Sequence, residues 1–210
     1  QNRALELAML LTLPAAVALI VLAEPVVTVL FERGAFSAAD TAATTAALAI
    51  FAAGVPAFVL VKALSPGFYA REDTATPVKV AGLCMVVNLL LNLLLMGPLQ
   101  HVGIAIATIV ASWFNAALLA LLLVRHGHFA ADARLRRRLP RSLLASLGMA
   151  AGLLVGRWLL APQLDGGGMA PILALAALVG GGLAAFAVLA HLLGAASLSE
   201  LRALIRRQPA

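Results

Sequence analysis

The sequence predicts an all-α integral membrane protein with six transmembrane helices. Of its 210 residues, 63% are hydrophobic and only 11% are charged, whereas soluble domains carry about 25% charged residues. The mean hydropathy is +1.03. The apolar residues form six long runs and not the short alternating segments of a β-barrel. Each run approaches or exceeds the roughly 17 to 25 residues that a helix needs to cross a bilayer. The runs are Leu7–Ala23, Ala42–Leu64, Val80–Met96, Val102–Val124, Leu143–Ala161 and Met169–Leu193.

The Lys and Arg residues predict how these helices are oriented. Successive helices alternate in direction, so the links between them alternate between the two sides of the membrane. If the N-terminus is inside, every Lys and Arg except Arg33 and Arg157 falls on the inner side. Cytoplasmic links carry the excess of Lys and Arg in membrane proteins, which places both termini of the chain in the cytoplasm. The net charge of +6 then reflects topology and contact with anionic membrane lipids, and nucleic-acid binding is not expected.

The link after the first run, residues 24–40, predicts a short helix and a turn on the outer side of the membrane. Its first half is mostly apolar, as expected for a helix that lies in the membrane interface. Glu32, Arg33 and Gly34 end this apolar stretch. Gly34 is the expected C-terminal stop, because glycine accepts the left-handed backbone that often follows a helix. Ser37 is the expected cap of the next helix.

The link between the second and third runs, residues 62–79, reads KALSPGFYAREDTATPVK. Pro66 and Gly67 are expected to end the second helix, and Pro77 suits the first turn of the third. The aromatic pair Phe68 and Tyr69 is expected at the level of the lipid headgroups. The other residues that define this link are charged and reach water from the interface: Lys62, Arg71, Asp73 and Lys79. The link therefore predicts a tight cytoplasmic turn anchored at the membrane surface.

Polar residues recur inside the third and fourth runs. Asn88 and Asn92 lie four residues apart, which places both on one face of a helix, with Cys84 one turn earlier as a packing residue. On the fourth run the spacing again gives one polar face, made by Thr108, Ser112 and Asn115. The link of residues 97–101 is short, so the two helices are expected to be antiparallel neighbours whose polar faces meet. Two interpretations stay open: hydrogen bonds that hold helices together, or a polar pathway for an ion or a lipid headgroup.

The chain divides into four parts. Residues 1–126 hold four transmembrane helices, residues 127–141 a basic cytoplasmic linker, residues 142–194 a final pair of helices, and residues 195–210 a cytoplasmic amphipathic tail, strongest at Leu198–Arg207. Because the chain starts with Gln1 and has no cleavage signal, it is expected to be part of a longer protein. It contains no Ser/His/Asp arrangement, no paired catalytic acids and no phosphate-binding glycine loop. An enzyme, a metal site and a cofactor are therefore not expected.

Three motifs occur in a fixed order: LFERGAF at Leu30–Phe36, the loop sequence at Ser65–Lys79, and GPLQHVGIAIAT at Gly97–Thr108. Together they resemble the MurJ/MviN family of lipid II flippases, within the multidrug/oligosaccharidyl-lipid/polysaccharide (MOP) exporter superfamily. The resemblance implies a fourteen-helix fold of two six-helix lobes and an extra pair, of which this chain would hold the ninth to fourteenth helices. It also implies a place in the bacterial inner membrane, with lipid II and an N-terminal lobe of the same protein as partners. The last two helices would line a groove for the lipid tail.

The resemblance also implies candidate roles for single residues. Asn88 and Thr108 match residues with which some family members bind sodium, and Asn92 stands where those members have Asp. Sodium or the membrane potential is thus the implied candidate for coupling. Two alternatives to a lipid II flippase remain: a superfamily member that exports drugs or another polysaccharide-linked lipid, and a membrane scaffold that transports nothing.

Overall fold

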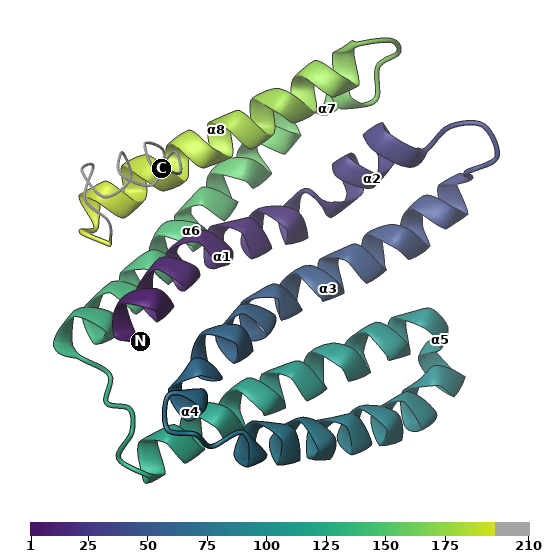
Figure 1. The fold of residues 1–210 in the computed structure, drawn as a ribbon. Helices are drawn as coiled ribbons and strands as arrows, with labels where there is room; N and C mark the ends of the chain where they lie inside the picture. The colour runs from purple at the N-terminus through teal and green to yellow at the C-terminus, as the bar shows by residue number, and fades with distance from the viewer. Residues whose placement is uncertain (196–210) are drawn as a thin grey trace, which may run out of the picture.

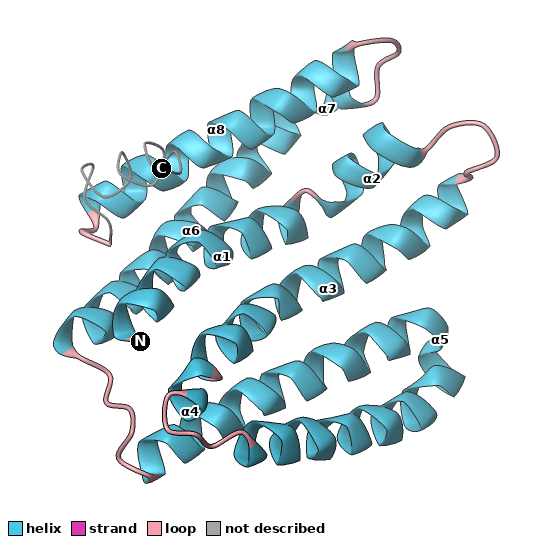
Figure 2. Cartoon of the chain, in the orientation of Figure 1, coloured by secondary structure: helices cyan, strands magenta, loops and turns pink. Residues whose placement is uncertain are grey.

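The computed structural model describes residues 1–195, and these residues form helices and connecting loops without a β-strand (Figures 1 and 2). The predicted amphipathic tail Leu198–Arg207 lies outside the described residues. In order, the helices are α1 (Asn2–Val21), α2 (Ala23–Phe31), α3 (Ala38–Leu64), α4 (Pro66–Tyr69), α5 (Ala75–Arg125), α6 (Ala133–Leu159), α7 (Ala161–Leu164) and α8 (Ala170–Leu192).

The prediction of six membrane-crossing helices is confirmed, although two of the six crossings belong to one bent helix, α5. Five helices of the described chain are long and apolar enough to cross a membrane: α1, α3, α5, α6 and α8. The longest, α5, has 51 residues and reverses direction at Gln100, whose backbone (φ 50°, ψ −130°) is not helical. Figure 1 shows α5 folding back on itself, so its two arms, residues 75–99 and 101–125, supply two of the six crossings.

The long helices pack in a simple order, with α1 at the centre (Figure 1). One side of α1 packs against α3, which in turn packs against α5, and the other side packs against α6, which carries α8. Two apolar clusters correspond to these two sides. One joins α1 to α6 and α8 through residues such as Met149 and Phe186, and the other joins α3 to α5 through residues such as Leu64 and Leu123.

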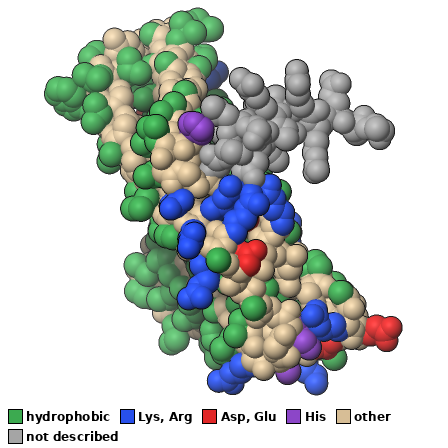
Figure 3. Space-filling view, turned by 90° about the vertical axis from the view of Figure 1, so that its left-hand side faces the viewer, with side chains coloured by type: hydrophobic (Ala, Val, Ile, Leu, Met, Phe, Trp, Pro, Cys, Tyr) green, Lys and Arg blue, Asp and Glu red, His purple; other side chains and the backbone are tan. Residues whose placement is uncertain are grey.

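The two ends of the bundle differ in charge. The N-terminus, α4 and the start of α6 lie at one end, and α2, α7 and the bend of α5 lie at the other (Figure 1). Every link assigned by sequence to the inner side therefore meets at the same end. Figure 3 shows that end, where Lys and Arg side chains gather between apolar flanks. This arrangement agrees with the charge pattern that predicted the orientation.

The basic linker predicted for residues 127–141 is shorter in the structure. α6 begins at Ala133, so most of the basic stretch forms its first turns. Asp132 caps this helix, because its Oδ1 accepts a hydrogen bond from the backbone N–H of Leu135 (2.7 Å). The basic composition of the segment suggested a link at the membrane surface. Because arginine is also a good helix former, the same residues form the start of α6.

Candidate functional site

Four of the five polar residues singled out on α5 line one shared groove. The first arm contributes Cys84 and Asn88, and the second contributes Thr108, Ser112 and Asn115, to an open depression of about 290 Å³. Asn92 does not line this groove, but its Nδ2 donates to Asn88 Oδ1 (2.5 Å). The structure therefore brings together all five polar residues singled out from the sequence.

The reversal of α5 depends on a close approach between its arms. A Cβ atom on Gly103 would lie 2.3 Å from the backbone oxygen of Leu95 and 2.6 Å from its carbonyl carbon. Only glycine fits at this position without moving backbone. Farther along, Trp113 Nε1 donates to the backbone oxygen of Ala53 (3.1 Å), which ties the second arm to α3.

Most polar groups in the groove are satisfied within their own helices. The Thr108 hydroxyl donates to the backbone oxygen of Ile104 (2.9 Å), and the Ser112 hydroxyl donates to the backbone oxygen of Thr108 (2.7 Å). Two amide oxygens are buried without a hydrogen-bond partner: Asn115 Oδ1 in the groove and Asn92 Oδ1 outside its lining. Buried acceptors of this kind are rare and call for water, a ligand or another part of the protein.

The donor set of the groove does not fit a tightly held cation. Its oxygens belong to neutral amides and hydroxyls, and Asn88 Oδ1 already accepts a hydrogen bond from Asn92. Hard cations in proteins are usually held by carboxylates as well as neutral oxygens. No Asp or Glu lines the groove, and the described chain has no group of three His, Cys, Asp or Glu residues that could hold a metal. Water or a hydroxyl-bearing ligand fits these atoms better.

The loop motif between α3 and α5 forms a compact turn. Arg71 holds it by donating to the backbone oxygens of Gly67 (Nη1, 2.7 Å) and of His128 (Nη2, 3.4 Å). Asp73 Oδ1 accepts the backbone N–H of Thr76 (2.9 Å) in the first turn of α5. Hydrogen bonds from the side chain and backbone of Thr76 hold the pKa of Asp73 below its usual value. The motif therefore ties α4, α5 and residue 128 together.

The other residues of this motif lie around the turn. Pro66 begins α4, Gly67 is buried against the side chain of Gln1, and Pro77 is buried in the first turn of α5. Tyr69 is 52% exposed, and Lys62 and Lys79 are exposed. Phe68, which was expected at headgroup level together with Tyr69, differs from Tyr69 in its burial. Its side chain is 1% exposed because α4 turns it into the apolar cluster with Leu64 and Leu123.

The external motif forms the predicted turn. α2 ends at Phe31, and Gly34 has a φ of +61°. Arg33 Nη2 donates to the backbone oxygen of Val29 (2.7 Å), and Glu32 Oε2 accepts the Thr41 hydroxyl (2.7 Å). Ser37 caps α3 as expected, in a capping box with Asp40. These contacts link the end of α2 to the start of α3.

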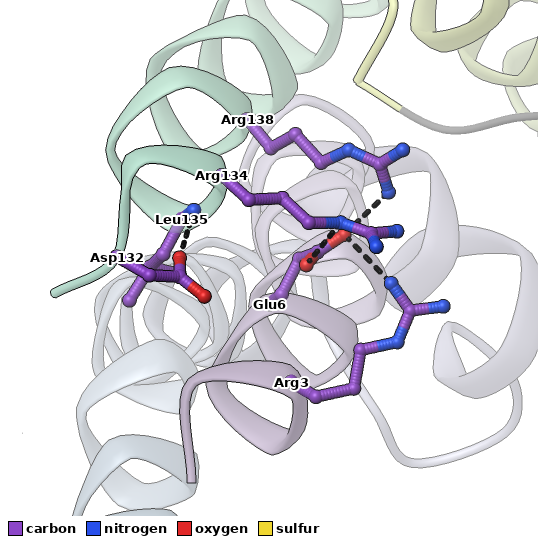
Figure 4. Close-up of polar contacts among 6 residues, drawn as sticks. All are labelled: Arg3, Glu6, Asp132, Arg134, Leu135 and Arg138. Carbon is purple, nitrogen blue, oxygen red and sulfur yellow. Dashed lines mark hydrogen bonds and ion pairs between the residues drawn. The ribbon is translucent and has the colours of Figure 1, made fainter.

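A buried acidic residue, Glu6 on α1, was missed by the sequence analysis. Its side chain is 6% exposed and faces three arginines (Figure 4). Arg138 Nη1 lies 2.5 Å and Arg3 Nη1 3.2 Å from Glu6 Oε1, and Arg134 Nε lies 3.2 Å from Oε2. Arg134 and Arg138 belong to α6, so this arginine cluster joins the first helix to the final pair. The sequence did contain a clue to this contact. Glu6 directly precedes the first apolar run, on the side of the membrane to which most of the arginines are assigned.

The final pair, α6 and α8, encloses a groove lined largely by small residues. Its volume is about 270 Å³, and its walls include Gly152, Gly156, Gly181 and Gly182. The helices meet closely beside it, because Cβ atoms on Gly156 and Gly182 would lie 2.9 Å from the side chains of Leu178 and Leu153. The groove has the apolar lining that an isoprenoid or acyl chain requires.

A family model and curated relatives that match this chain carry the same description. A family model described as "Lipid II flippase MurJ" matches residues 1–174. A curated relative from Rhizobium meliloti (strain 1021), named "Probable lipid II flippase MurJ", is 46% identical over 209 residues, which are 99% of this chain and 39% of the relative. The relative of the same name from Rhizobium tropici is 48% identical over 149 residues, which are 71% of this chain and 28% of the relative.

A solved structure has the same fold. "Lipid II flippase MurJ, inward closed conformation" aligns with a TM-score of 0.74 at 23% identity, over 98% of this chain and 39% of that chain. The chain thus spans about two fifths of the length of this structure and of the Rhizobium meliloti relative.

Proposed function

Because the chain belongs to the MurJ lipid II flippase family, we propose that it forms the C-terminal part of a lipid II flippase. The whole protein would move the lipid-linked peptidoglycan precursor from the inner to the outer leaflet by alternating access. It would be a transporter and not an enzyme. The family match over residues 1–174 is the observation that carries this proposal. The relatives, which are named as probable lipid II flippases, favour it over an exporter of drugs or a non-transporting scaffold.

The proposed location is the bacterial inner membrane, with both termini of the chain in the cytoplasm. The support is the charge pattern, since Lys and Arg gather at the end of the bundle that holds the N-terminus. Lipid II, membrane lipids and an N-terminal lobe of the same protein would be the partners.

Two features of the described helices suit this role. The groove between α6 and α8 would hold part of the lipid tail while the headgroup crosses elsewhere. The polar groove of α5 would present Asn115, whose amide oxygen has no hydrogen-bond partner, to water or to the hydroxyl groups of the headgroup. Because the neutral donor set fits a cation poorly, sodium binding in this groove is not part of the proposed transport cycle.

Complementation tests the proposed function. The full-length gene that carries this sequence is expected to restore growth to bacteria depleted of their own flippase, and to restore exposure of labelled lipid II at the outer leaflet. A drug exporter would instead lower the intracellular level of a dye without restoring wall synthesis. A scaffold would do neither, and either result would overturn the proposal.

Replacing Asn88 and Asn92 together by Leu is expected to lower lipid II transport at least about tenfold while folded yield falls less than about twofold. The two amides bond to each other and not to a neighbouring helix, so their loss removes the polar face of the first arm without breaking a link between helices. Transport in proteoliposomes and yield by size-exclusion chromatography are the measurements. Equal losses of both would identify the pair as packing residues. The matched control, Leu90→Ala, changes an exposed residue on the same arm.

A further inference from the structure

The end of the bundle opposite the N-terminus contains a pocket that none of the preceding sites uses. It lies between α2, α6 and α7 and has a volume of about 480 Å³, within the range of 300 to 1,000 Å³ typical of small-molecule sites. Its walls combine charged, aromatic and apolar side chains: Glu24, Thr28, Leu154, Arg157, Trp158 and Asp165.

The charged groups of this pocket include both signs. Arg157 forms an ion pair with Glu24, and its Nη1 donates to the backbone oxygen of Val21 (3.4 Å). Asp165 adds a second carboxylate to the walls. The side chains of Arg157 and Glu24 are 36% and 58% exposed, so both remain accessible to a ligand. With two carboxylates and one guanidinium, the pocket favours a ligand that carries a cation beside an anion.

The pocket also lies where lipid and water meet. Arg157 and Trp158 are in the last turn of the membrane-crossing helix α6, which ends at Leu159. Trp158 is 77% exposed and Leu154, one turn earlier, is 56% exposed. Tryptophan is enriched at the membrane interface, where its ring contacts both chains and headgroups. A lipid can therefore reach the charged groups with its head while its chains lie along these two side chains.

We propose that this pocket binds the headgroup of an aminophospholipid such as phosphatidylethanolamine. The primary ammonium would donate hydrogen bonds to the carboxylates of Glu24 and Asp165, and the phosphate would accept from Arg157. A choline headgroup fits less well, because methyl groups replace the N–H donors that the carboxylates require. A phosphatidylglycerol headgroup has no cation and meets a pocket with excess negative charge.

Lipid retention measures this preference. The purified full-length protein is incubated in detergent with equal amounts of phosphatidylethanolamine, phosphatidylcholine and phosphatidylglycerol of identical acyl chains, and bound lipid is counted by native mass spectrometry. The wild type is expected to retain phosphatidylethanolamine about tenfold over each of the others, the equivalent of one charge-assisted hydrogen bond. Glu24→Gln combined with Asp165→Asn is expected to abolish the preference.

Two further variants make the result decisive. Asp165→Asn alone leaves the Glu24–Arg157 ion pair intact, and it should lower the preference even if the double variant folds poorly. Glu32→Gln removes a carboxylate at the same end of the bundle that does not line the pocket, and it should leave the preference unchanged. The proposal is overturned if the wild type shows no preference, if Asp165→Asn retains it in full, or if Glu32→Gln loses it.

Discussion

Replacing Glu6 by Ala is expected to lower the free energy of unfolding by about 3 kcal/mol. The carboxylate is 6% exposed and is the shared partner of Arg3, Arg134 and Arg138. Its removal leaves three guanidinium groups facing one another without the negative charge between them. Breaking a buried ion pair costs 3–5 kcal/mol, and the low end applies because the side chains of Arg3 and Arg134 are 48% and 46% exposed.

The measurement is the denaturation midpoint of the purified protein in detergent. Glu6→Gln should lose most of the same stability, because an amide can accept hydrogen bonds but carries no charge. The matched control is Glu24→Ala, which breaks an ion pair whose members are 58% and 36% exposed; exposed pairs contribute about 0–1 kcal/mol. A loss no larger for Glu6→Ala than for Glu24→Ala would show that the arginine cluster does not hold α1 to α6.

The arginine cluster also shows where prediction from sequence ended. Arg138 lies 132 positions from Glu6, and only the packing of α6 against α1 brings the two together. The pattern of Lys and Arg predicted which side of the membrane these residues face, since that depends on counting charges along the chain. It could not predict which arginines gather around one carboxylate, because that depends on the neighbours of α1.

Local features were predicted more completely. The six apolar runs were found because a helix in lipid needs a minimum apolar length, and the turn at Gly34 because few residues adopt a positive φ. The polar faces of α5 were found because spacing fixes which residues share a side of a helix. Which oxygens lack partners, such as Asn115 Oδ1, depends on interatomic distances between two arms. The same holds for the burial of Phe68, whose side chain lies in an apolar cluster.

Replacing Gly103 by Ala is expected to open the α5 hairpin and lower the free energy of unfolding by about 3 kcal/mol. The new Cβ would lie 2.3 Å from the backbone oxygen of Leu95. A side chain could rotate away from such a contact, but a backbone atom inside a helix can move only if the arm moves. Overpacking of this kind typically costs 1–3 kcal/mol and occasionally more, and the rigid partner argues for the upper part of that range.

Cys84 gives a direct measurement of the opening. It is the only cysteine of the 210 residues, is 5% exposed, and packs in the cluster that contains Leu119 and Leu123 of the second arm. If the arms separate, its thiol should react with a maleimide at least several-fold faster, in a full-length protein that lacks other cysteines. The matched control is Gly97→Ala at the same bend, where a Cβ meets no atom within 4 Å and alanine favours the helix. Gly97→Ala adds the same methyl group without a clash. If the two variants are labelled at equal rates, the close approach of Gly103 to Leu95 is not what holds the two arms of α5 together.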